Sequence, residues 1–63
     1  MLKLLKETDE GPVEGVLVSV FGWWYLVRIE RRNGCNNIMA QSYDMRLADL
    51  LNLLEDQGWE VMT

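Results

Sequence analysis

Residues 16–42 are rich in β-branched and aromatic residues, and every second residue falls on the same face when they are read as β-strands. Asn33 and Gly34 give the strongest local signal in the chain. Both residues tolerate the positive φ angles that a two-residue type I′ hairpin turn requires at its central positions. The sequence therefore predicts an antiparallel hairpin around this pair, with Ile29 opposite Ile38.

A second hairpin turn is predicted at Phe21 and Gly22, although Phe is a poor residue for the first central position of a type I′ turn. A two-residue turn here pairs Val18 with Tyr25. It also places these side chains on the same face as Ile29. Both predicted turns thus assign the same residues to the same face of the sheet. This agreement in parity supports the sheet more strongly than either turn alone.

Residues 44–57 carry the pattern of an amphipathic helix, because four leucines with the spacing i, i+3, i+4, i+7 form one apolar stripe: Leu47, Leu50, Leu51 and Leu54. Ser42 or Asp44 is a suitable N-cap. Gly58 fits the position after the helix, where a left-handed conformation is needed. Residues 59–62 are then predicted to form a short final strand.

The predicted sheet carries more apolar surface than one helix covers. The helix is expected on the face with most of the β-branched residues: Val16, Val18, Val20, Tyr25, Val27 and Ile29. The other face then stays open and mixes apolar with polar side chains: Leu17, Ser19, Trp24, Leu26, Arg28, Glu30, Met39 and Gln41. Such a patch on a small monomer usually marks an interface. The alternative is that residues 2–6, which fit an edge strand and a helical turn equally well, fold over this face.

The chain of 63 residues is long enough for one small domain, over residues 1–63. Such a core is marginal and often needs a disulfide, a metal or oligomerisation. Cys35 is the only cysteine and there is no histidine, so oligomerisation or a larger partner is the remaining support. The predicted fold is α+β: an antiparallel meander of three to four strands, one helix packed on one face, and a short C-terminal strand.

The residue types argue against catalysis and against a metal or cofactor. General acid–base chemistry usually uses His or a carboxylate pair in a cleft, whereas the acids at 49, 55 and 56 fit the solvated side of the helix. Cys35 lacks a second cysteine and a neighbouring base, which is typical of a bystander thiol. We therefore expect a protein that is not an enzyme, with no cofactor and no metal site.

The charge balance bears on the partner. Six basic and ten acidic residues give a net charge of −4, which argues against direct nucleic-acid binding as the function. Arg28 and Arg32 share a face with Trp24, as on single-strand binding platforms, but Glu30 lies between them and Arg is equally favoured at protein interfaces. The acids either mimic nucleic-acid phosphate toward a basic groove or form an ordinary solubilising surface.

Two further observations concern location. No apolar run approaches the length of a membrane span, and residues 1–6 do not form a secretory signal, so no membrane association is expected. A single cysteine fits a reducing compartment, and we expect the protein in the cytoplasm, which is the host cytoplasm if a phage encodes it.

In size, acidic charge and layout the chain resembles the small inhibitory proteins that phages make, such as anti-CRISPR proteins and inhibitors of host polymerases or nucleases. The layout is a short meander, one helix and a terminal strand that reads Gly-Trp-Glu-Val at residues 58–61. No motif carries the resemblance, so it transfers no functional residue. It implies stoichiometric binding to a large host nucleoprotein complex, without catalysis.

We therefore expect a non-catalytic protein-binding inhibitor or modulator of a larger nucleic-acid-handling complex, of the anti-defence type if phage-encoded. The expected contact residues lie on the open face or on the helix: Leu17, Trp24, Leu26, Arg28, Arg32, Asp49, Glu55 and Asp56. The alternative is a structural homodimer or oligomer subunit in which open faces pack together or edge strands pair.

Overall fold

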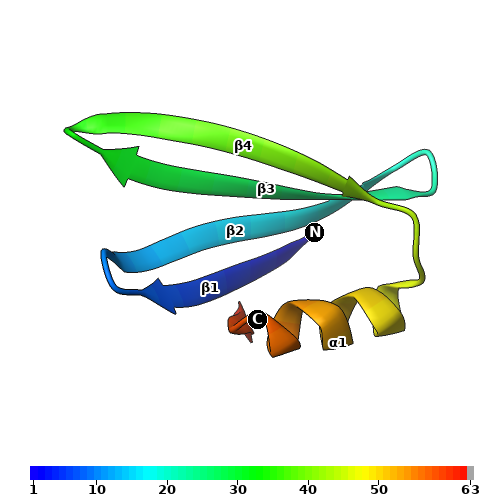
Figure 1. Ribbon diagram of the computed structural model, residues 1–63. Coiled ribbons are helices and arrows are strands. Elements are labelled where there is room, and N and C mark those ends of the chain that lie inside the picture. Colours follow the sequence, from blue (N-terminus) through cyan, green and yellow to red (C-terminus); the bar gives the residue numbers. More distant parts are fainter. Residues whose placement is uncertain (63) are drawn as a thin grey trace.

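The computed structural model describes residues 1–62, except for the side chain of Arg32, and within them it shows one sheet and one helix (Figure 1). The elements follow in the order β1 (Leu2–Thr8), β2 (Gly11–Val20), β3 (Trp23–Arg32), β4 (Cys35–Tyr43), α1 (Leu47–Asp56) and β5 (Trp59–Met62). The strands lie side by side in the order β4-β3-β2-β1-β5, and every neighbouring pair is antiparallel. This arrangement confirms the predicted α+β class, with the N-terminal residues as a strand.

Both predicted hairpin turns form. Positive φ angles occur at all four central residues: Phe21 (51°), Gly22 (83°), Asn33 (53°) and Gly34 (79°). Val18 pairs with Tyr25, and Ile29 pairs with Ile38. The predicted parity of β2, β3 and β4 is therefore confirmed.

The helix α1 begins after Arg46, which is its N-cap residue in extended conformation. No side-chain hydrogen bond caps this end, so the predicted cap by Ser42 or Asp44 is wrong. At the other end Gly58 has a φ of 98°, and its N–H donates to the carbonyl oxygen of Glu55 over 3.0 Å. Gly58 thus occupies the predicted left-handed position after the helix.

The core lies between α1 and one face of the sheet, and its side chains are at most 3% exposed: Leu4, Leu17, Leu26, Leu50, Leu54 and Trp59. Trp59, the first residue of β5, lies over Gly15 of β2. A Cβ atom at Gly15 would come within 2.9 Å of the Cζ3 atom of the indole. The Nζ atom of Lys6 lies 5.9 Å from the centroid of the Trp59 ring. The glycine therefore makes room for the largest core side chain.

The helix covers the face opposite to the predicted one. Leu17 and Leu26 pair across β2 and β3 and are buried beneath α1, whereas the valine face is uncovered. Parity tells which residues share a face, but not which face receives a helix. Here α1 connects β4 to β5, which run parallel at opposite edges, and connections between parallel strands of one sheet are right-handed in nearly all cases. With two-residue turns and L-residues, that hand places the helix over the leucines.

Candidate protein-binding face

The side of the sheet that faces away from α1 is here called the open face. Its apolar residues come from all five strands: Leu5, Val16, Val18, Val20, Trp23, Tyr25, Val27, Ile29, Ile38, Ala40 and Met62. Several of them are large and well exposed, and Ile38 reaches 71%. Apolar patches of this extent are uncommon on monomeric proteins and usually mark interfaces. The apolar surplus predicted from the sequence is present, but on the other side of the sheet.

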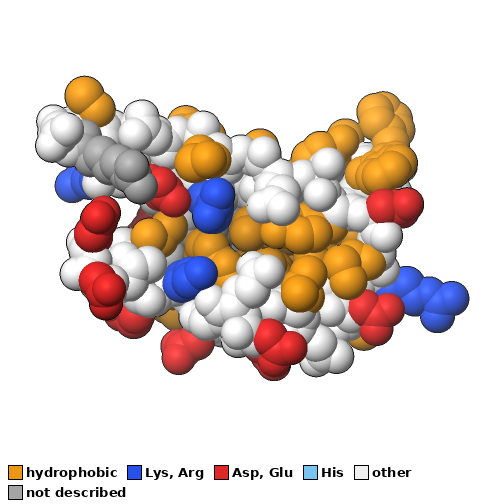
Figure 2. All heavy atoms as spheres, in the orientation of Figure 1, with side chains coloured by type: hydrophobic (Ala, Val, Ile, Leu, Met, Phe, Trp, Pro, Cys, Tyr) orange, Lys and Arg blue, Asp and Glu red, His pale blue; other side chains and the backbone are white. Residues whose placement is uncertain are grey.

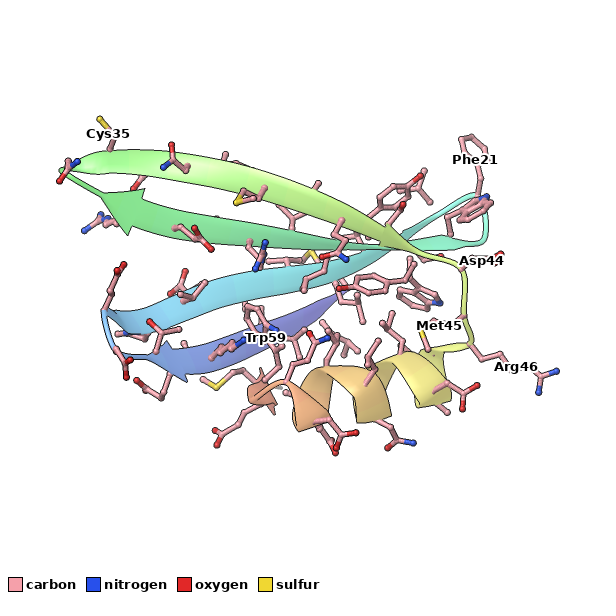
Figure 3. All side chains as sticks on the ribbon, viewed as in Figure 1. Phe21, Cys35, Asp44, Met45, Arg46 and Trp59 are labelled. Atoms are coloured by element: carbon pink, nitrogen blue, oxygen red, sulfur yellow. The ribbon has the colours of Figure 1, made fainter. Side chains whose placement is uncertain are left out.

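The open face continues into the β2–β3 turn, where Phe21 is 99% exposed. Figure 3 shows its ring pointing away from the body of the molecule. Its φ of 51° is in the left-handed region, which costs an L-residue with a Cβ atom about 1–2 kcal/mol. A side chain so exposed gains almost no packing to offset this cost. Backbone strain of this kind clusters at functional sites.

Phe21 lies between two other exposed apolar residues. Val20 is 45% exposed and Trp23 is 47% exposed, and both flank the turn as a directly opposed pair. These three residues are here called the apolar tip. Figure 2 shows hydrophobic atoms gathered at this end of the molecule, at the upper right. The tip and the open face form one continuous candidate site, because the pair at the turn belongs to both.

The structure corrects three of the predicted contact residues. Leu17 and Leu26 are fully buried core residues and are not available to a partner. Trp24 is half-buried, lies opposite Tyr43 and packs against the core. All three lie on the helix-covered face, because the helix takes the side that the prediction left open. Trp23, rather than its neighbour, is the indole on the open face.

Arg28, predicted to share a face with Trp24, lies on the same covered side of the sheet. The Nη1 atom of Arg28 lies 3.9 Å from Oε1 of Glu30, and its Nη2 donates to Sδ of Met39 over 3.9 Å. The side chain of Arg28, which is 30% exposed, thus contacts two neighbours on the covered face. The side chain of Arg32 lies outside the described residues.

The predicted helix acids are also separated from the open face. Asp49, Glu55 and Asp56 are exposed on α1, which lies on the other side of the sheet (Figure 1). A partner docked on the open face would therefore meet the sheet and not these acids. The acids remain able to act at a distance, through electrostatic attraction during approach.

The open face has a shallow hollow of about 240 Å³, lined by residues of β1, β2, β3 and β5 that include Lys3, Glu14 and Met62. Across residues 1–62, no three His, Cys, Asp or Glu side chains are grouped so that they could hold a metal ion. Cys35 is an exposed free thiol beside the β3–β4 turn. Among the described residues no helix has the length and apolar character that crossing a membrane requires.

Sequence reasoning found the apolar excess but missed the apolar tip. The signal was present, since Phe precedes Gly at a turn where Asn is the favoured residue. A bulky residue at such a place indicates that something other than the turn selects it. No protein-family model matches the chain, and comparisons with curated proteins and with solved structures give no match either.

Proposed function

We propose that this chain is a non-catalytic binding protein that docks through its open face and apolar tip onto a larger protein and thereby inhibits or modulates it. The observation that carries the proposal is Phe21, a fully exposed aromatic side chain held in a strained turn. Phe, like Tyr and Trp, is enriched in the buried core of protein–protein interfaces. A strained turn that presents one is best explained by a contact outside the chain.

The size of the open face supports the same function. The strands β2 and β3 have ten residues each, so they extend about 33 Å, and five strands span about 20 Å. The resulting area of about 600 Å² approaches the roughly 800 Å² that each partner buries in a standard interface. The face is therefore large enough for a specific protein contact.

The class of partner stays a prediction from the sequence. A net charge of −4 favours approach to a basic protein surface, which nucleic-acid-handling complexes offer. Exposed acids on α1 supply part of this charge without occupying the contact. A cytoplasmic location and an anti-defence role in a phage are consistent with this proposal and rest on the sequence alone.

The test replaces Phe21 of the apolar tip with a residue that the turn accepts. Phe21→Asn keeps a favoured turn residue, and the immobilised variant should fail to retain the partner that the wild type captures from a lysate of the producing cells. Asp56→Asn, on the opposite side of the molecule, is the matched control and should retain it. Quantitative mass spectrometry compares the three captures. Capture of the same proteins in equal amounts by the wild type and by Phe21→Asn would contradict the proposal.

A further inference from the structure

The two edges of the sheet differ in length and in charge. The strand β4 forms one edge over nine residues, and all of them except Tyr43 are exposed. It has no charged residue and no proline. The other edge, β5, has four residues and includes Glu60. Natural proteins usually protect an edge strand by shortness, charge, proline or a bulge, and β4 has none of the first three.

We infer that β4 is an interface, and that it pairs antiparallel with β4 of a second copy of this chain across a two-fold axis. The two sheets then join into one continuous sheet. This inference is independent of the proposed function, since it uses the strand edge rather than the open face or the apolar tip.

The hydrogen-bonding parity of β4 fits such a pair. Arg32 and Cys35 flank the two-residue turn, so they form a hydrogen-bonded pair, and hydrogen-bonded pairs alternate along an antiparallel ladder. Cys35 and every second residue after it therefore direct their N–H and C=O groups to β3. The residues between them direct theirs outward: Asn36, Ile38, Ala40 and Ser42. A second strand at this edge would pair all of these groups.

One register satisfies the whole strand at once. With Met39 on the two-fold axis, every residue of β4 has an opposite residue in the other copy, and the outward-directed residues meet each other: Asn36 with Ser42 and Ile38 with Ala40. These are the pairs that the parity makes hydrogen-bonded. The two Met39 residues form a pair without hydrogen bonds, in which side chains come closest. The strand is thus complementary to itself.

Charge favours a second copy over a charged partner. A copy of a chain with a net charge of −4 is repelled unless its acids are kept away, and β4 brings none. The nearest strand acid, Glu30 of β3, is one strand from the edge and lies 3.9 Å from the guanidinium of Arg28, whereas the acids of the β1–β2 hairpin, such as Glu7 and Glu14, lie at least two strands from the edge. That distance is about 10 Å, beyond the screening length of about 8 Å at physiological ionic strength. The two-fold pairing uses both β4 edges and stops at a dimer.

A charge-swap experiment at Met39 tests the pairing. Met39 is on the helix side of the sheet, so its substitution leaves the open face unchanged. Analytical ultracentrifugation of the wild type should show a dimer that dissociates on dilution. Met39→Lys places like charges directly opposite each other and should weaken the dimer about tenfold. Met39→Glu should weaken it too, and an equimolar mixture of the two variants should restore it.

Mixing does not change the fold of either variant. Recovery of the dimer in the mixture would therefore show that the single variants fail to dimerise because of charge and not because of a folding defect. The inference is overturned if the wild type stays monomeric at all concentrations, if Met39→Lys dimerises like the wild type, or if the mixture does not recover. Phe21→Asn should dimerise normally, so a failure of the proposed function leaves this result untouched.

Cross-linking gives a second, independent readout. In a Cys35→Ser background, Met39→Cys should form a disulfide between copies under mild oxidation, because Cα atoms of such a pair lie about 4.5 Å apart. Ile38→Cys in the same background is the control, since its partner is Ala40 and the two new thiols are offset. Faster cross-linking of Met39→Cys supports the pairing. Equal rates, or faster cross-linking of Ile38→Cys through packed open faces, would overturn it.

Discussion

Both faces of the sheet carry many apolar residues, but the helix covers only one of them. The covered face is built from leucines and includes Gly15, which leaves space for the ring of Trp59. The open face is built from valines, isoleucines and aromatic residues. They lie opposite each other on neighbouring strands, but no helix packs on them. Hydrophobicity alone therefore does not decide which face becomes a core. The hand of the connection from β4 through α1 to β5, and the space that Gly15 leaves for Trp59, decide it.

The largest expected difference between the faces is in stability. Leu17→Ala removes a completely buried side chain and should lower the free energy of unfolding by about 2–5 kcal/mol, a large part of what a small domain has. Val20→Ala on the open face should cost less than about 1 kcal/mol. Urea denaturation of both variants measures the difference. Equal losses would show that the open face is covered in solution.

A second prediction concerns the space above Gly15. Gly15→Ala places a methyl group 2.9 Å from an indole carbon that belongs to a rigid ring, and should cost about 1–3 kcal/mol. The near-ultraviolet circular dichroism of the tryptophans should change with it. Trp59→Leu in the same chain should relieve the clash, so the double variant should lose less than the sum of the two single losses. Additive losses would count against the close contact.

A third prediction sharpens the contrast at the apolar tip. Phe21→Asn should raise the free energy of unfolding by about 1 kcal/mol, because Asn tolerates the positive φ of this turn position. Thermal denaturation measures the change. Phe21→Gly is the companion variant and should not destabilise the turn either. A fall in stability for both would mean that the aromatic ring contributes to the fold.

The smallest effect is expected at Lys6. Its ammonium lies over the ring of Trp59, and Lys6→Gln should cost about 0.5–1 kcal/mol by removing this cation–π contact. Lys3→Gln is the matched control on the other side of the same strand and should be nearly neutral. Chemical denaturation at low and high salt separates the contact from general charge effects. Equal losses of stability for the two lysine variants would show that the cation–π contact does not contribute to stability.

Local rules predicted most of this fold from the sequence. The turn at Asn33 and Gly34, the parity of the hairpins, the leucine stripe of α1 and the role of Gly58 all depend on residues that are close in the chain. The site was predicted less well. The side that the helix takes depends on the hand of a connection between the two edges of the sheet, and residue alternation does not encode that hand.

The consequence for individual residues was large. Because the helix covers the other face, Leu17 and Leu26 lie in the core instead of at the predicted interface. For the same reason Trp23, which was predicted under the helix, is exposed. The position of Phe21 in a strained turn was visible in the sequence, but its full exposure follows only from the direction in which the hairpin points. The open edge at β4 likewise depends on the order of strands, which no short segment determines.

The pairing of β1 with β5 has a consequence for how the molecule forms. Lys6 pairs with Trp59 and Lys3 with Met62, so the earliest and the latest strands become neighbours. Contacts between such distant segments require the longest loop to close and are expected to form slowly. Until they do, the hairpins from β1 to β4 expose leucines on one side and valines on the other. The slowest kinetic phase should therefore be the arrival of the Trp59 ring above Gly15, and the fluorescence of that indole should report it once Trp23 and Trp24 are replaced by Phe.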